Sequence, residues 1–169
     1  MSALTEFRRM KDEFFAKDAQ SPLTEEQKKS FNGLHYYDEN TSLRLELSIQ
    51  EFPEKQMVPI QTSTGEVRTY QRFGRIEFAV DGQSASLTVY LTDHGFFLPF
   101  VDALAGKETY PAGRYLEIES LPDGKYLVDF NHAYNPYCAY SDRWSCPLTP
   151  AENRLSIPIE AGEKIYEAH

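Results

Sequence analysis

The spacing of hydrophobic residues changes along the chain, and its first part has the period of a helix. Near the N-terminus apolar side chains recur every three or four residues among charged ones, at Leu4, Phe7, Met10 and Phe14. This spacing predicts an amphipathic helix over residues 3–17 that lies against a core. Residues 24–27, Thr-Glu-Glu-Gln, fit a capping box. We therefore expect a short second helix that ends near Asn32-Gly33.

From residue 42 onward the period becomes two, as in a strand with one buried face. Apolar residues alternate with polar ones at Leu43, Leu45, Leu47 and Ile49. Further strands are predicted at 58–61, 66–73, 75–80, 84–91, 114–119, 125–130 and 154–159, and at 96–100 as an edge or bulge because of its proline. Hairpin turns are expected at Thr64-Gly65 and Asp81-Gly82. About seven to nine short strands predict a mainly β fold, a single antiparallel barrel or sandwich with the two N-terminal helices over one end.

The composition is that of one acidic globular domain. The 169 residues carry a net charge of −9, with 41% hydrophobic and 25% charged residues. We expect a single domain over 1–169, with 1–37 as a helical cover and 42–169 as a β core with motif-rich loops. The 17 Lys and Arg form no basic stripe, so binding to nucleic acid or to a membrane surface is not expected.

The hydropathy of the chain indicates the expected cellular location of the protein. The first residues carry charges where a signal peptide needs an apolar stretch, and no apolar run approaches the roughly 20 residues that span a bilayer. A cytoplasmic location is therefore expected. In a reducing cytosol the default for the two cysteines, Cys138 and Cys146, is a pair of thiols. Their spacing does not match a zinc knuckle, and no metal site is expected.

Residues 129–140 combine polar side chains with four aromatic rings, which is an unusual density for one segment. In one interpretation, Asn131 and Asn135 cap their own backbone and the tyrosines pack as a lid. In the other, amides and phenols form a pocket wall that orients a polar ligand. A Cys138–His132 nucleophile and base is a third interpretation, without a known cysteine-enzyme signature to support it.

A second polar cluster lies between residues 100 and 115 and contains Asp102, Glu108, Tyr110 and Arg114. The arginine could hold a ligand carboxylate or phosphate with two hydrogen bonds. The favoured alternative is a buried bridge with Asp102 or Glu108, because an arginine near acids usually pairs with them.

Together these clusters predict a β domain that binds a small polar or amphipathic molecule in an aromatic-lined pocket. The predicted ligand contacts are Tyr110, Arg114, Asn131, Tyr134, Asn135, Tyr137 and Tyr140. One alternative is a small-molecule enzyme, similar to a hydrolase, that uses Asp102, Glu108 or Cys138. Another is a protein-interaction module with an exposed strand edge or aromatic patch. The sequence indicates no cofactor and no oligomeric state.

Short motifs spread over nearly the whole chain give a family resemblance. They include Ser21-Pro-Leu23, Phe31-x-Gly-Leu-x-Tyr-Tyr37, Phe100-x-Asp102, Gly106-x-Glu-Thr-Tyr110, Gly113-Arg-Tyr-Leu116, Asp129-Phe-Asn131, Ala133-Tyr-Asn-Pro136, Cys138-Ala-Tyr140, Cys146-Pro147, Glu152-Asn-Arg-Leu155 and Ala161-Gly-Glu-Lys164. In these the chain resembles the bacterial and archaeal proteins grouped as domain of unknown function 1684. The resemblance implies no established activity. Ala103-Leu-Ala105 and His132 depart from its pattern, which weighs against a Cys138–His132 pair.

Overall fold

The computed structural model describes residues 2–166, and two helices precede its β structure. Helix α1 (Ala3–Lys17) begins after Ser2, whose hydroxyl accepts a hydrogen bond from the Thr5 amide. Helix α2 (Glu25–Ser30) begins with the predicted capping box, in which Thr24 and Gln27 bond each other's backbone amides. Both predicted helices are confirmed. None of the described helices is both long enough and apolar enough to cross a membrane.

The strands form two antiparallel sheets. The larger has the order β2-β4-β5-β6-β7, with β3 also paired to β4; its strands are β2 (Gln50–Glu51), β3 (Met57–Gln61), β4 (Val67–Val80), β5 (Gln83–Thr92), β6 (Gly95–Phe100) and β7 (Arg114–Leu116). The smaller has the order β1-β9-β8, from β1 (Arg44–Leu47), β9 (Tyr126–Asp129) and β8 (Glu119–Ser120). Within residues 2–166 the sheets do not close into a barrel, so the predicted mainly β fold is confirmed in its sandwich form.

Four of the predicted strands differ from the structure. Residues 66–73 and 75–80 belong to one long strand, β4, whose register shifts beside Gly74. A Cβ atom at Gly74 would lie 2.7 Å from the Gln50 carbonyl oxygen, so the glycine allows β2 to pair closely there. Residues 114–119 are divided between β7 and β8. Residues 154–159 form no strand; Ile157 and Ile159 are buried, but the segment packs irregularly against the core.

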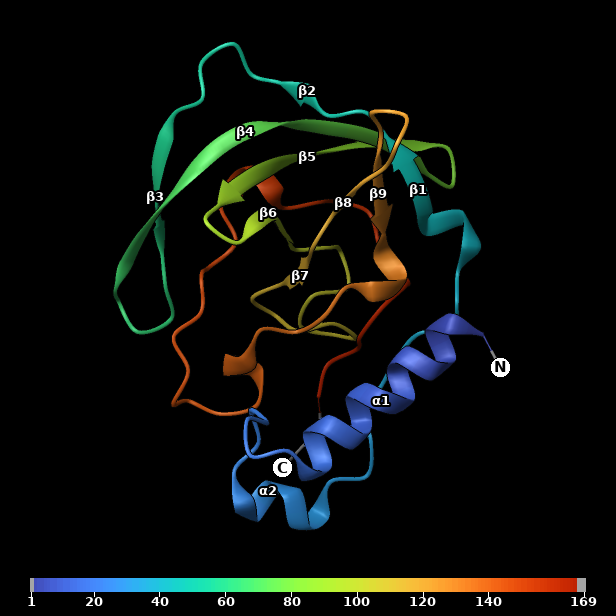
Figure 1. Ribbon diagram of the computed structural model, residues 1–169, viewed down its shortest axis with the longest axis vertical. Helices are drawn as coiled ribbons and strands as arrows, with labels where there is room; N and C mark the ends of the chain where they lie inside the picture. Colours follow the sequence, from blue (N-terminus) through green and yellow to red (C-terminus); the bar gives the residue numbers. More distant parts are fainter. Residues whose placement is uncertain (1, 167–169) are drawn as a thin grey trace.

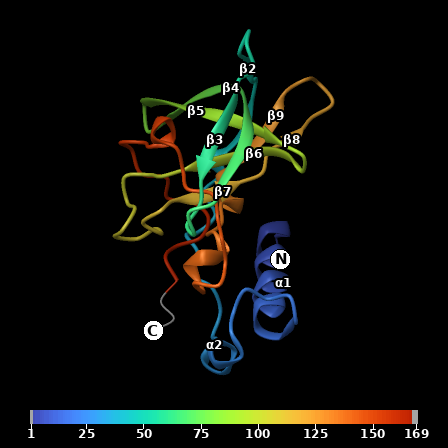
Figure 2. The ribbon, with the colours of Figure 1, turned by 90° about the vertical axis from the view of Figure 1, so that its left-hand side faces the viewer.

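Two groups of buried side chains hold the molecule together. The larger fills the space between the sheets and includes Ile76, Val89, Leu98 and Phe130, each fully buried. The smaller joins the helices to the loops after β9, and consists of Phe15, Leu23, Leu34 and Tyr140. Figures 1 and 2 show the helices at one end of the sandwich, with the loops of residues 130–166 between them and the sheets. Four short 3₁₀ helices occur in the described chain: η1 (Thr41–Leu43), η2 (Phe130–His132), η3 (Tyr137–Ala139) and η4 (Ala151–Asn153).

Candidate functional site

A pocket of about 810 Å³ opens where α1 faces the end of the sandwich. Helix α1 contributes Phe7 and Lys11 to its wall, and the remaining walls come from β4, the segment from β7 to β8, β9 and the loops after it. We call it the aromatic pocket; it is lined by Phe7, Lys11, Arg68, residues 115–119, Leu127, Asp129, His132, Tyr134, Pro136, Tyr137 and residues 144–147. Within residues 2–166, no group of three or more His, Cys, Asp and Glu side chains could hold a metal ion.

One half of the aromatic pocket is formed by four rings. The rings of Tyr137 and Trp144 meet edge to face with centroids 5.1 Å apart, and those of Tyr115 and Tyr134 do so at 5.9 Å. The Trp144 indole donates a hydrogen bond to the Pro22 carbonyl at 3.1 Å, which fixes the ring in the wall. Burial raises the pKa of the Tyr115 and Tyr134 phenols, so both stay neutral hydrogen-bonding groups.

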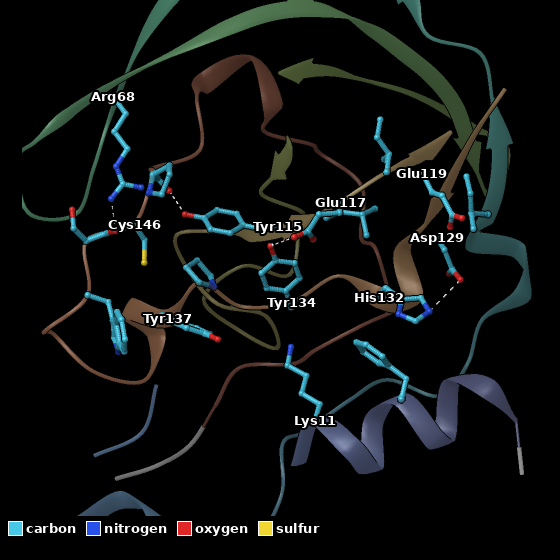
Figure 3. A pocket seen from close by; sticks show the side chains of 18 residues that line it. Lys11, Arg68, Tyr115, Glu117, Glu119, Asp129, His132, Tyr134, Tyr137 and Cys146 are labelled. Carbon is cyan, nitrogen blue, oxygen red and sulfur yellow. Dashed lines mark hydrogen bonds and ion pairs between the residues drawn. The ribbon is translucent and has the colours of Figure 1, made fainter. Parts of the chain in front are cut away.

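The other half carries the carboxylates Glu117, Glu119 and Asp129 among apolar side chains. The Tyr134 hydroxyl donates to the Glu117 carboxylate at 2.9 Å. His132 lies 3.7 Å from the Asp129 carboxylate and packs against the Phe7 ring. Figure 3 shows Asp129 and His132 at the opposite end of the pocket from the aromatic wall around Cys146. The pocket therefore offers aromatic surface at one end and, at the other, hydrogen-bond acceptors beside apolar side chains.

A buried carboxylate, Glu163, fixes one side of the pocket. Its side chain is 3% exposed and forms an ion pair with Lys11 of α1. The same carboxylate accepts hydrogen bonds from the Asn135 amide and the Tyr140 hydroxyl, both at 3.0 Å. The Lys11 ammonium also lies 5.0 Å from the centroid of the Tyr134 ring, in a cation–π contact. Lys11 thus belongs to the pocket wall and at the same time ties α1 to the loops after β9.

A second hollow, of about 690 Å³, adjoins the aromatic pocket along the surface of β4 to β6. The two share Arg68, Tyr115, Glu117, Tyr134 and Pro147 as lining residues. The Tyr115 hydroxyl donates to the Pro147 carbonyl, and this contact lies at the boundary between the two spaces. A ligand longer than one pocket could extend past Tyr115 into the second hollow.

Of the predicted ligand contacts, Tyr134 and Tyr137 line the aromatic pocket. Arg114 is fully buried and donates to the backbone carbonyls of Ile159, Ala161 and Glu163. Burial lowers the pKa of its guanidinium, which lies 3.7 Å from the Asp102 carboxylate. This is the buried arrangement that the sequence favoured over an anion clamp.

Three more of the predicted contacts are also bonded inside the protein. The Asn131 side chain exchanges two hydrogen bonds with the Asn40 backbone, at 2.8 and 2.9 Å. The Asn135 amide donates to the Lys164 carbonyl at 3.0 Å, and Tyr140 is 4% exposed beside Glu163. These three side chains build the support under the pocket, and none of them is among its lining residues.

The three candidate catalytic residues occupy separate places. Asp102 is buried and accepts hydrogen bonds from the Thr109 hydroxyl and the Ile159 amide. Glu108 accepts from the Tyr37 hydroxyl at 2.8 Å and lines a third, smaller hollow of about 440 Å³. Cys138 lies 3.8 Å from the hydroxyl of Tyr110, the seventh predicted ligand contact. The structure therefore does not assemble these residues into one site.

Several pocket residues have no counterpart among the sequence candidates: Phe7, Lys11, Tyr115, Glu117 and Trp144. Trp144 is the only tryptophan of the chain, and this alone could have drawn attention to it. Tyr115 follows Arg114 directly in a predicted strand, so the two side chains are expected on opposite faces, but the sequence does not show which face meets the pocket. The helical spacing places Phe7 on the apolar face of the helix over residues 3–17 and Lys11 among the charged residues between, which does not indicate a pocket.

The fold and the pocket define a mainly β sandwich domain with a hollow bounded by an N-terminal helix. The chain belongs to the family described as "Protein of unknown function (DUF1684)", which matches residues 29–164. The family resemblance is confirmed. A similar solved structure is the solution NMR structure of an uncharacterized protein of Haloarcula marismortui, with 37% identity and a TM-score of 0.71 over 95% of this chain and 91% of that one. No curated protein matches the sequence.

Proposed function

We propose that this protein binds a small amphipathic molecule in the aromatic pocket. The observation that carries the proposal is one 810 Å³ pocket whose wall is mostly apolar, with aromatic rings at one end and three carboxylates, Glu117, Glu119 and Asp129, at the other. Binding sites for small molecules are typically of about 300–1,000 Å³, mostly apolar, with a few polar groups that orient the ligand. The aromatic pocket has both the size and this distribution of chemistry.

The contacts of the lining residues indicate the polarity of the ligand. Lys11 is already paired with Glu163, and Arg68 donates to the Ser145 carbonyl at 3.0 Å. Glu117 and Glu119 are exposed carboxylates on the segment from β7 to β8. A ligand with hydrogen-bond donors at one end would meet these acceptors, while its apolar body would pack on Tyr137 and Trp144.

The proposal is tested with the dye N-phenyl-1-naphthylamine, which is uncharged, has an apolar aromatic body with one N–H donor, and fluoresces when removed from water. We expect it to bind the wild-type protein saturably and to quench the emission of Trp144, the only tryptophan. The Tyr137→Ala variant removes a ring that contacts Trp144 at 5.1 Å. It should weaken binding by roughly tenfold, because losing a central aromatic contact typically costs more than about 1 kcal/mol.

Phe52→Ala is the matched control, because Phe52 is a half-buried ring that packs under Arg72 at 4.2 Å and lines neither the aromatic pocket nor the second hollow. Its affinity for the dye should equal that of the wild type. An equal loss of dye affinity in both variants would mean that the substitutions act by destabilising the fold and not by removing a contact in the pocket. Unchanged affinity in Tyr137→Ala would place the dye elsewhere and refute the proposed site.

A further inference from the structure

Two thiols lie next to each other at the wall of the aromatic pocket. Cys146 is 7% exposed and lines the pocket, whereas Cys138 in η3 is partly exposed, and both are free. The backbone amide of Cys138 donates a hydrogen bond to the Cys146 sulfur at 3.3 Å. Because N and Cα are about 1.5 Å apart, the Cys146 sulfur lies within about 5 Å of the Cys138 α-carbon. This is within reach of a disulfide without a large backbone movement.

The backbone around each cysteine is held by bonds that do not involve the sulfurs. Cys146 pairs with Ser63 in the turn between β3 and β4: its amide donates to the Ser63 hydroxyl at 3.1 Å, and its carbonyl accepts from the Ser63 amide at 2.9 Å. On the other side, the amides of Ala139 and Tyr140 close the 3₁₀ turn around Cys138, at 2.9 and 3.0 Å. The two sulfurs therefore stay close together in the reduced protein.

The surroundings of Cys138 favour a reactive thiolate. The Cys146 thiol donates a hydrogen bond to the Cys138 sulfur, and this lowers the pKa of Cys138 to about 6. The Tyr110 hydroxyl, 3.8 Å from the same sulfur, is a second donor. A thiolate is the nucleophile of thiol–disulfide exchange, and partial exposure makes Cys138 accessible. Cys146, more deeply buried, is placed as the resolving partner.

We propose that Cys138 and Cys146 are a redox-active pair that forms a reversible disulfide by exchange with a low-molecular-weight disulfide such as glutathione disulfide. The Cys138 thiolate attacks one sulfur of the small disulfide; an S–S bond breaks, and one thiolate leaves. Cys146, whose pKa is raised by its hydrogen bond to Cys138 and by burial, then gives up its proton as its sulfur attacks the Cys138 sulfur of the mixed disulfide and releases the second thiolate. The protons of the two cysteines pass to the two leaving thiolates. One small disulfide is reduced to two thiols while the protein dithiol is oxidised.

Oxidation has a built-in optical signal. Trp144 lies in the loop that the bridge would close, two residues before Cys146, and its ring meets that of Tyr137, the neighbour of Cys138. Formation of the bond should change the packing of these rings and so the emission of the only tryptophan. This readout needs no ligand, and the inference is independent of the proposed binding function.

The test equilibrates the full-length protein with mixtures of reduced and oxidised glutathione, stops the exchange with acid and measures intact mass. We expect loss of two hydrogens without a retained glutathione, together with a change in Trp144 emission. Trypsin cleaves after Arg143, so the bridge would join peptide 126–143 to peptide 144–154. Detection of this linked pair in the wild-type protein supports the proposal directly and does not depend on any variant.

Two variants establish the order of attack. Cys146→Ser should accumulate a mixed disulfide on Cys138, roughly tenfold more than the wild type, because the resolving thiol is missing. Cys138→Ser should react slowly, since Cys146 is buried. The proposal is overturned if the wild-type protein carries two separate glutathiones, if its thiols stay reduced throughout, or if the linked peptides come only from a covalent dimer.

Discussion

The ion pair between Lys11 and Glu163 is the contact whose loss should most affect both the fold and the pocket. In Lys11→Met the apolar stem of the side chain is kept, and the carboxylate of Glu163, 3% exposed, loses its cation. Breaking a buried ion pair typically costs about 3–5 kcal/mol. The Lys11 side chain is 18% exposed and Glu163 keeps two hydrogen-bond donors, so water and these donors offset part of the loss. We expect about 2–4 kcal/mol in the free energy of unfolding.

The assay is urea unfolding followed by circular dichroism, with Lys29→Met as the control. Lys29 and its partner Glu26 form a helix-surface pair whose side chains are 74% and 86% exposed. An exposed pair contributes little, so this variant should stay within about 0.5 kcal/mol of the wild type. Both substitutions exchange a lysine for a methionine on a helix, so the difference between them isolates the effect of burial.

A double variant tests whether the uncompensated charge of Glu163 causes the loss of stability in Lys11→Met. If the cost arises from an uncompensated buried charge, Glu163→Gln should restore part of the stability of Lys11→Met, because a neutral amide oxygen can still accept from Asn135 and Tyr140. We expect a recovery of at least about 1 kcal/mol. Two results would refute the argument: a Lys11→Met cost no larger than that of Lys29→Met, or a further loss of stability when the charge of Glu163 is removed.

Three further predictions concern other parts of the molecule. Gly162→Ala should cost more than about 2 kcal/mol in thermal unfolding, because φ is +81° and the new Cβ would lie 2.7 Å from two carbonyl oxygens; Gly124→Ala, at φ +84° in open space, should cost less. Burial raises the pKa of Glu152, but hydrogen bonds from an arginine and a tyrosine lower it overall. The resulting stability is present above the unfolded pKa of about 4.3 and is lost as pH falls through the folded value. In Glu152→Gln the urea midpoint of unfolding should therefore fall less than in the wild type as the pH is lowered. Alkylation of Cys138 should rise through about pH 6, and at higher pH in Cys146→Ala, which lacks the thiol donor.

The helices and most strands were predictable because their signals are local. The capping box of α2 and the Asp81-Gly82 turn depend on residues adjacent in sequence. The error at 154–159 has a physical cause. Ile157 and Ile159 are buried with the alternation of a strand, but this alternation does not show whether the backbone of the segment pairs with a neighbouring strand. Hydrophobic alternation reports burial and not backbone pairing.

The candidate site was predicted in part, because a local sequence pattern does not show which side chains of a loop point into a pocket and which point into the core. Residues 129–140 do reach the pocket through Tyr134 and Tyr137, whereas Asn131 and Asn135 from the same segment turn inward. Lys11 and Glu163 are separated by 152 positions, and no spacing rule relates them. The composition of a segment can therefore indicate a pocket without showing which of its side chains line it.

The buried polar groups explain how irregular loops can form a defined pocket wall. Residues 159–163 form no strand, and although the Gly162 carbonyl accepts from the Tyr37 amide, the carbonyls of Ile159, Ala161 and Glu163 accept from a side chain instead. Arg114 donates these three hydrogen bonds, and Glu163 binds the backbone amide of Asn135 in the loop opposite. Unpaired backbone groups are costly to bury, so one arginine and one carboxylate supply partners that the isolated backbone bonds of these loops do not. Amides and charges are dense around the pocket because its supporting loops need them, and the rings of Tyr137 and Trp144 remain available to a ligand.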